Sequence, residues 1–185
     1  MFTNLKALAI PEGDVVKITV GGVTLWEASA SYKNWVKYST EADGVTIYNN
    51  GLGYKNGYRL SSSGGESANT KDSVTGFIPV NGGETIYIKA KDTQGNDVYW
   101  YNTSRSTNYI NAYTADKTLL YAGNAKGTYG SSNLIESMSA DTVNGVSIVK
   151  IKALSDIAYI RISVAGDAYA VSGADMIVTV NESIT

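Results

Sequence analysis

The side chains best suited to binding chemistry lie in the stretch NDVYWYNTSRSTNYINAY, residues 96–113. An aromatic ring can cover the apolar C–H face of a sugar, while amide, guanidinium and phenol groups bond its hydroxyls. Because side chains alternate between the two faces of a strand, we expect Val98, Trp100, Ile110 and Ala112 to face a core. The residues predicted to face outward or into a groove and to bind a glycan are Tyr99, Tyr101, Tyr109, Asn111 and Tyr113, with Arg105 nearby.

The same outward-facing aromatic residues have a second interpretation, in which their rings cover a sheet or form a contact between subunits. Tyr and Trp lose little side-chain entropy and carry polar tips, so they suit protein interfaces as well as sugars. A second candidate is residues 48–64, YNNGLGYKNGYRLSSSG, with Tyr54 as an aromatic contact and Arg59 as a planar donor. Its alternative is a glycine-rich turn region in which Tyr54 and Tyr58 hold loops against a sheet.

Catalysis has little support in this composition. The chain has no His and no Cys. It therefore lacks the usual general base near neutral pH and any thiolate nucleophile. Paired carboxylates, as in glycosidases, remain the only plausible catalytic device, and no pair stands out among the 17 acidic residues. We therefore expect a protein that is not an enzyme, with a wall glycosidase as the weakest alternative.

No cofactor is expected, and a structural calcium ion has only a weak signal. Ca²⁺ takes six to eight oxygen ligands, several of them from one loop. The nearest local match is KDTQGND, residues 91–97, which contains Asp92 and Asp97. Its spacing does not resemble an EF-hand.

The net charge and hydropathy of the chain restrict the classes of partner that we expect. A formal net charge of -2 argues against nucleic acid, which requires many Lys and Arg contacts to phosphate. No run reaches the ~18 apolar residues of a membrane helix, and the first residues do not read as a signal peptide. We expect neither nucleic acid nor membrane among the partners.

Turn signals recur along the whole chain and separate short runs rich in Val, Ile, Thr and Tyr. This pattern is typical of an all-β sandwich or barrel. The clearest alternation lies in residues 84–91 and 157–164, where Ile residues face one way and Tyr, Lys or Arg the other. Residues 145–152 and 175–180 are also predicted strands, the last more fully buried. Residues 4–10 and 133–139 are the only modest helix candidates.

An N-terminal hairpin is predicted at residues 14–27, where two β-rich runs meet at Gly21 and Gly22. A polar run follows, so we place a boundary near residue 30. The predicted organisation is a hairpin segment at 1–30 and a β-sandwich domain at 31–185. Trp26 and Trp35 flank the boundary and are expected to anchor the hairpin to the domain or to a neighbouring subunit.

The order of several phrases resembles a known family. These are VVKITVGGVTLWE, NNGLGYKNGYRLSSSGGESA, VTGFIPVNGGETIYIKA, YINAYTADKTLLYAG, AYIRISVAG and ADMIVTVNESIT. Together they resemble the jelly-roll domains, similar to carbohydrate-binding modules, of tail-associated and minor structural proteins from phages and prophages of Gram-positive bacteria. The resemblance implies an antiparallel jelly-roll sandwich preceded by a short hairpin. It also implies a virion setting.

The expected function is therefore a phage structural protein that attaches weakly and multivalently to host cell-surface carbohydrate. Weak single sites need several copies to give useful avidity, so a homo-oligomer is expected, with a trimer favoured. The protein would be made in the bacterial cytoplasm and would contact other virion proteins on the particle exterior. The main alternative is a head or tail decoration protein whose aromatic residues form subunit interfaces.

Overall fold

The computed structural model describes residues 17–20, 23–27, 34–36, 53–101, 107–126 and 131–184, and for 17–20, 23–27 and 131–132 it describes the backbone alone. The chain divides into two compact units, residues 1–32 and 33–185. The division lies two residues beyond the predicted boundary near residue 30. Each unit is described by itself.

The first unit contains one antiparallel hairpin, formed by β1 (Lys17–Val20) and β2 (Val23–Glu27). Val20 pairs with Val23, so the two predicted β-rich runs form a hairpin, whose glycine pair at 21–22 lies outside the described residues. Ile18 pairs with Trp26, and the register shifts between Ile18 and Thr19. The side chain of Trp26 lies outside the described residues.

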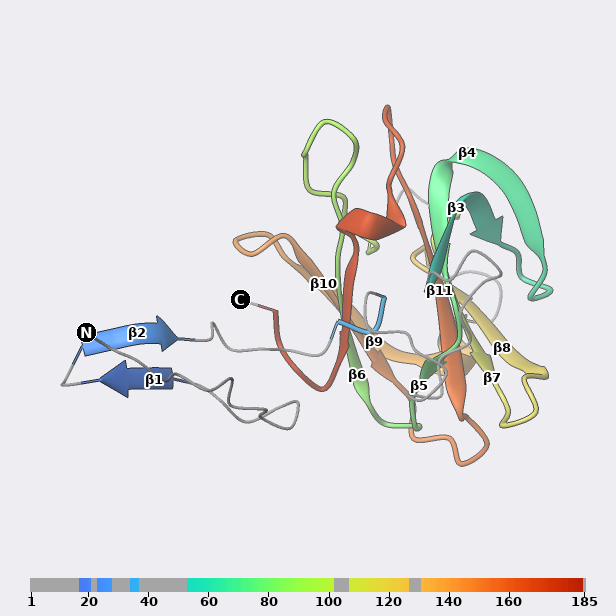
Figure 1. Ribbon diagram of the computed structural model, residues 1–185. Helices are drawn as coiled ribbons and strands as arrows, with labels where there is room; N and C mark the ends of the chain where they lie inside the picture. Colours follow the sequence, from blue (N-terminus) through green and yellow to red (C-terminus); the bar gives the residue numbers. More distant parts are fainter. Residues whose placement is uncertain are drawn as a thin grey trace. The chain divides into compact units, whose positions relative to one another are not determined.

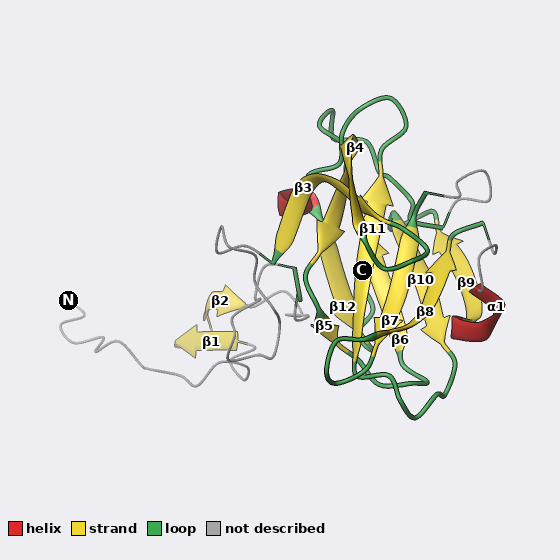
Figure 2. Cartoon of the chain, turned by 90° about the vertical axis from the view of Figure 1, so that its right-hand side faces the viewer, coloured by secondary structure: helices red, strands yellow, loops and turns green. Residues whose placement is uncertain are grey.

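The second unit is built from two antiparallel sheets (Figures 1 and 2). The four-stranded sheet has the order β12 (Ile177–Val180), β6 (Thr85–Lys89), β10 (Val146–Ile151), β9 (Ile135–Asp141). The six-stranded sheet has the order β3 (Tyr54–Leu60), β4 (Glu66–Thr75), β11 (Tyr159–Ala165), β7 (Tyr109–Tyr113), β8 (Leu119–Asn124), and β5 (Ile78–Pro79) also pairs with β11. The predicted all-β class is confirmed.

One apolar core lies between the inner faces of the two sheets. Ile86 and Ile88 of β6 are fully buried, and so are Ile160 and Ile162 of β11. The predicted alternation is visible in the burial of β6, where Tyr87 and Lys89 are only partly buried. In β11 the alternate residues Arg161 and Ser163 are outside the apolar core cluster but are buried as well. Burying each of these aliphatic side chains contributes about 1.5–3 kcal/mol.

Trp100 is the largest fully buried side chain of this core. Its Nε1 donates to the carbonyl of Tyr109 at 3.3 Å, so the indole dipole is satisfied inside the core. Val98, Ile110 and Ala112 belong to the same cluster. The predicted inward face of this region is therefore confirmed.

Residues 34–36 run beside β12. The Trp35 N–H donates to the Val178 carbonyl at 2.9 Å. The side chain of Asn34 donates to Met176 O at 3.1 Å and accepts from the N–H of Val36 and of Val178. Trp35 packs against the core of its own unit. The segment thus lies along β12 as a turn, held by one backbone bond and by the side chain of Asn34.

The predicted helix at 133–139 is wrong. The α-helix α1 spans only Ser131–Leu134, and Ile135–Asp141 form strand β9. Pairing with β10 places Met138 opposite Val149 and against the core. Ser and Asn have weak helix propensity, so the sheet contacts decide the structure of this segment. The other predicted helix, at 4–10, lies outside the described residues.

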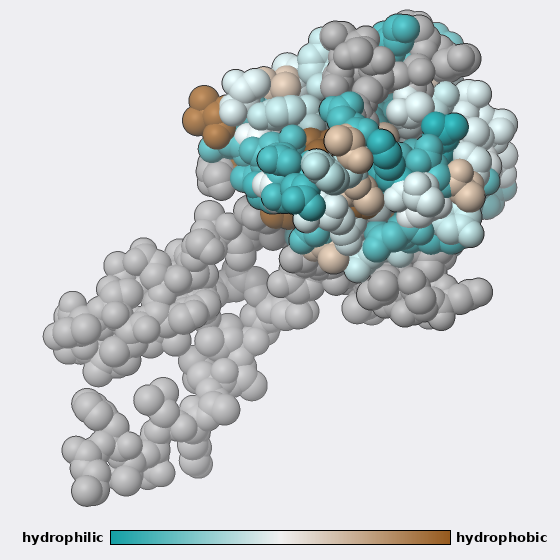
Figure 3. All heavy atoms as spheres, turned by 90° about the horizontal axis from the view of Figure 1, so that it is seen from above, coloured by the Kyte–Doolittle hydropathy of each residue, from teal (hydrophilic) through white to brown (hydrophobic). Residues whose placement is uncertain are grey.

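Helix is otherwise limited, in the described ranges, to the 3₁₀ turn η2 (Gly173–Asp175). No helix of these ranges is long and apolar enough to cross a membrane. Seen from above, the surface is mainly hydrophilic and its apolar residues are scattered singly (Figure 3). The large hydrophobic side chains that are most exposed in the described part are Val143 and Tyr169.

Candidate functional site

The row Tyr109, Asn111 and Tyr113 lies on the face of β7 opposite to Ile110 and Ala112, as alternation predicts. The prediction that this row faces solvent is wrong, because its three side chains are only 9 %, 0 % and 4 % exposed. A second layer of chain covers the outer face of the six-stranded sheet at this point. The two-face alternation was correct, but a strand can be buried on both faces.

The covering layer is an arm, residues 58–70, made of the end of β3, the turn at 61–65 and the start of β4. β4 pairs with β11 only through Asp72, Ser73 and Val74, so the arm extends beyond the sheet. Gly57, with a φ of +77°, lies at a register shift between Asn56 and Tyr58. A residue with positive φ and an irregular register bends a strand pair. β3 and β4 curve across β7 and β8 (Figures 1 and 2).

Three kinds of contact hold the arm on the sheet. Leu60 packs with Val74 and Tyr109 in a small apolar cluster separate from the main core. Asn111 Nδ2 donates to the carbonyl of Ser61 at 3.0 Å. At the turn, a Cβ placed on Gly64 would lie 3.2 Å from Cδ2 of Leu119 in β8. The arm therefore reaches across β11 and β7 to β8.

An ion pair joins the arm to the buried guanidinium of Arg161. One guanidinium nitrogen of Arg161 lies 2.5 Å from Glu66 Oε1, and its Nε donates to Thr75 O at 3.1 Å. Lys55 Nζ lies 3.1 Å from the other carboxylate oxygen of Glu66. Burial acts to raise the pKa of Glu66, but the hydrogen bonds and charges of Arg161 and Lys55 outweigh it, so the pKa is lowered. Glu66 is thus held ionised.

Asn111 and Tyr113 are buried beside this ion pair. Burial raises the pKa of Tyr113, and the charge of Arg161 together with side-chain hydrogen bonds to Asn111 and Arg161 offsets part of that rise. The two side chains therefore belong to one buried polar cluster with Arg161 and Glu66.

Aromatic rings border this polar cluster. Phe77 meets Tyr113 edge-to-face at 4.9 Å between ring centroids, and Tyr159 at 6.0 Å. Lys117 Nζ lies 5.2 Å from the Phe77 centroid, and the Arg161 guanidinium lies 5.1 Å from it. Phe77 and Tyr159 are half-buried, so each ring offers part of its surface to solvent. Aromatic surface beside hydrogen-bonding groups is the combination that binds sugars.

The sequence analysis missed part of this cluster. Tyr159 and Arg161 lie on the polar face of the predicted strand at 157–164, so alternation predicts which side of the sheet their side chains occupy. Their partners Glu66 and Phe77 come from other elements, which no local pattern links to β11. The candidate site is the outer face of the six-stranded sheet formed by Glu66, Phe77, Asn111, Tyr113, Tyr159 and Arg161.

The remaining predicted residues lie elsewhere or have structural roles. Tyr54 packs against the core, and its ring occupies the space that a Cβ on Gly173 would need. Tyr101 is half-buried and contacts the core, so its predicted outward orientation stays a prediction. Tyr99 and Arg59 are half-buried. Arg105 lies outside the described residues.

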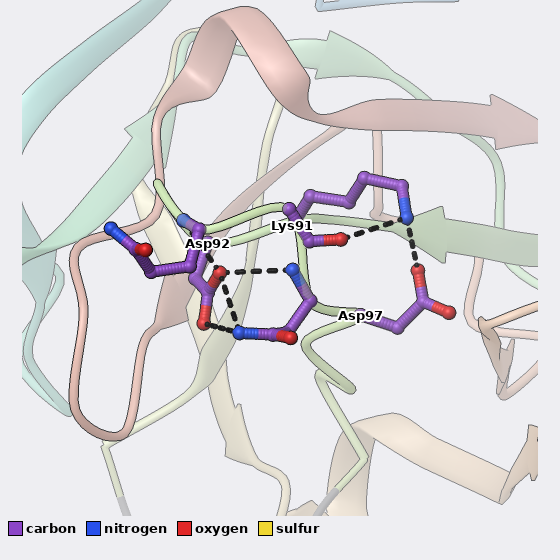
Figure 4. A network of polar contacts seen from close by, with 6 residues as sticks. Lys91, Asp92 and Asp97 are labelled. Carbon is purple, nitrogen blue, oxygen red and sulfur yellow. Dashed lines mark hydrogen bonds and ion pairs between the residues drawn. The ribbon is translucent and has the colours of Figure 1, made fainter.

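The candidate calcium loop, residues 91–97, is closed by its own hydrogen bonds (Figure 4). The Asn96 amide donates to the Asp92 carboxylate and is the main cause that lowers the pKa of Asp92. Asp92 Oδ1 also accepts from the backbone N–H of Gln94 at 2.9 Å and of Asn96 at 3.0 Å, and these bonds lower the pKa further. Asp97 pairs instead with Lys91 Nζ at 2.9 Å. N–H and ammonium donors occupy the positions that a cation would need. Within the described ranges, no group of three or more acidic residues could hold a metal ion.

Comparisons with known proteins add no relative to this description. No family model matches the chain, and neither a curated protein nor a solved structure matches it.

Proposed function

We propose that the second unit is a glycan-binding module of jelly-roll fold, without catalytic activity, that a phage particle displays for attachment to its host. The observation that carries this proposal is the outer face of the six-stranded sheet. It combines partly exposed aromatic rings with the hydrogen-bonding groups of Asn111, Tyr113 and Arg161. A purely apolar outer face would suit a subunit interface better.

The strand order supports the jelly-roll assignment. The chain passes back and forth between the two sheets. The six-stranded sheet contains β4, β7, β8 and β11, and the four-stranded sheet contains β6, β9, β10 and β12. Alternation between two sheets in this manner is a feature of double-sheet jelly rolls.

The chemistry of the face favours binding over hydrolysis. A retaining or inverting glycosidase needs one carboxyl group that is protonated at working pH. Glu66 is the acidic residue of the candidate site, and its lowered pKa keeps it ionised. A carboxylate committed to Arg161 and Lys55 orients other groups but does not donate a proton.

The virion setting rests on the resemblance of the phrase order to phage structural domains. Attachment through a single sugar-binding face is weak, so the proposal includes a homo-oligomer, a trimer in the favoured form, that presents several faces at once. The N-terminal unit, with its hairpin, would connect the domain to the particle.

The proposal is tested by co-sedimentation with purified cell walls from a panel of Gram-positive bacteria. Wild type is expected to bind at least one wall type, and Tyr159→Ala is expected to lose binding without loss of the folded far-UV spectrum. Tyr169→Ala is the matched control, because Tyr169 is 48 % exposed on a loop outside the candidate site. Light scattering gives the oligomeric state. Absence of wild-type binding to every wall, or equal binding by both variants, would contradict the proposal.

A further inference from the structure

Basic side chains outnumber acidic ones on the outer face of the six-stranded sheet, although the whole chain carries a formal net charge of -2. The basic residues are Arg161, Lys55 and Lys117, and the acidic residues beside them are Glu66 and Asp116. Glu66 is bonded to both Arg161 and Lys55, so it balances only one of these two positive charges. The excess positive charge is therefore local to this face and is not a property of the whole surface.

Lys117, in the turn between β7 and β8, carries its charge beside the aromatic rings. Its Nζ lies 5.2 Å from the Phe77 centroid and 5.9 Å from the Tyr159 centroid. An ammonium group within about 6 Å of a ring centroid is attracted by the negative face of the ring. Lys117 is exposed and both rings are half-buried, so the charge and part of the ring surface meet solvent together. A ligand reaches this part of the face without any movement of the arm.

The turn that carries Lys117 is strained at this residue. Lys117 has a φ of +65°, in the left-handed region that favours Gly and Asn. Its N–H donates to Thr114 O at 3.0 Å and closes the turn. Asp116 accepts from Thr114 Oγ1 and from the N–H of Thr118, so its carboxylate is bonded within the turn. Gly or Asn would make the same turn with less strain. The turn alone therefore does not explain a Lys here, whereas a ligand for its charge does.

The side chains of this part define the ligand class. A partly exposed ring stacks on the C–H face of a sugar, and an ammonium group beside it bonds a phosphate or carboxylate as a point charge. Lys55 repeats the combination, because its Nζ lies 3.4 Å from the Tyr58 centroid while it also pairs with Glu66. A sugar polymer with regularly spaced anionic groups thus finds the same combination twice on this face.

We propose that the outer face binds an acidic polysaccharide, with Lys117 paired to a phosphate or carboxylate group and Tyr159 stacked on a sugar ring. This inference rests on the proposed glycan-binding function and specifies its ligand class. Lys117 is the residue that selects the acidic ligand over a neutral one. Binding should weaken as salt is added, because dissolved ions screen exposed charges.

The probes are dextran, carboxymethyl dextran and phosphorylated dextran, which share one backbone and differ in charge. Affinity electrophoresis and calorimetry at low and at physiological salt measure their binding. Wild type is expected to bind a charged form about tenfold more tightly than uncharged dextran, because several weak ion pairs act together. The charged form that binds more tightly identifies the anionic group. Equal affinity for charged and uncharged dextran would overturn the proposal.

Lys117→Asn tests the selecting residue. Asn removes the ammonium group and tolerates the positive φ, so relief of strain should offset the lost ring contact and the thermal midpoint should change little. Affinity for the charged dextran should fall about fivefold, and Lys117→Arg, which keeps the charge, should retain it. A loss of affinity in Lys117→Arg as large as that in Lys117→Asn would contradict a role for the charge.

The matched control is Lys150→Gln. It removes one positive charge from β10 in the other sheet, from a side chain that is 44 % exposed. Its affinity for charged dextran should equal that of wild type. Equal losses in Lys150→Gln and Lys117→Asn would show attraction to the overall charge without a site, and would overturn the proposal.

Binding to cell walls separates this inference from the proposed function. Added NaCl should release wild type from the walls that it binds, and charged dextran should compete for it. Wall binding together with no binding to either charged dextran would overturn the acidic ligand and leave the proposed function standing. No binding to any wall or polymer would overturn both.

Discussion

The ion pair between Arg161 and Glu66 should be the strongest single polar contact of the arm, and Glu66→Gln removes its charge. The Arg161 side chain is 8 % exposed and that of Glu66 is 22 % exposed. Breaking a fully buried pair costs about 3–5 kcal/mol. The glutamine oxygen can still accept one hydrogen bond, and Glu66 keeps some solvent, so we expect the free energy of unfolding to fall by about 2 kcal/mol. The thermal midpoint should fall by roughly 4–8 °C.

The matched control is Glu136→Gln. Glu136 pairs with Lys150 at 3.1 Å, and the two side chains are 49 % and 44 % exposed. Exposed pairs of this kind contribute about 0–1 kcal/mol. Urea unfolding followed by tryptophan fluorescence measures both variants under the same conditions. A loss for Glu66→Gln no larger than that for Glu136→Gln would refute the reasoning that the arm is held by a buried charge.

The pH dependence gives a second readout of the same contact. The pKa of Glu66 is lowered below its ordinary value of 4.5 in the folded protein. Its contribution to stability is therefore complete above that value and is lost as the pH falls through the lower folded pKa. The difference between wild type and Glu66→Gln should stay constant from about pH 7 to about pH 5 and shrink below that. A difference that persists unchanged in acid would show that the carboxylate charge is not its cause.

Three further predictions follow from packing and loop geometry. Tyr109→Ala should reduce the free energy of unfolding by about 3–5 kcal/mol, measured in urea, because it leaves a void under the arm; a loss below about 1 kcal/mol would place the ring in solvent. Gly173→Ala should lower the thermal midpoint, because its Cβ would lie 2.1 Å from an atom of the Tyr54 ring, and an unchanged midpoint would contradict that packing. Millimolar CaCl₂ should leave the thermal midpoint unchanged, because backbone N–H groups already bond the Asp92 carboxylate and Lys91 already forms an ion pair with Asp97. A clear rise in the midpoint would reveal a cation site.

The sequence predicted the sheets well because alternation is a local property. In β6 and β11 the buried Ile residues fall on every second position, and the inner core follows directly. The inward position of Trp100 was predicted for the same reason. The hairpin at Gly21 and Gly22 was likewise visible, since turn glycines between β-rich runs act over a few residues.

The burial of the Tyr109, Asn111 and Tyr113 row could not be predicted from the sequence. Alternation shows that the row opposes the core, but it does not show whether another part of the chain covers it. The cover comes from the arm, some 50 residues earlier, through Ser61 O and Asn111 Nδ2. The pairing of Arg161 with Glu66 spans 95 residues and has no local signal either.

The composition under the arm differs from that of an ordinary packed layer. A cover that served only stability would be most favourable over apolar side chains, as the packing of Leu60 from the arm against Val74 and Tyr109 shows. Beside that apolar cluster the arm bonds the amide of Asn111 and pairs Glu66 with the buried guanidinium of Arg161, and both contacts require desolvation of polar groups. This polar cluster, bordered by the partly exposed rings of Phe77 and Tyr159, is the part of the layer that packing alone does not explain.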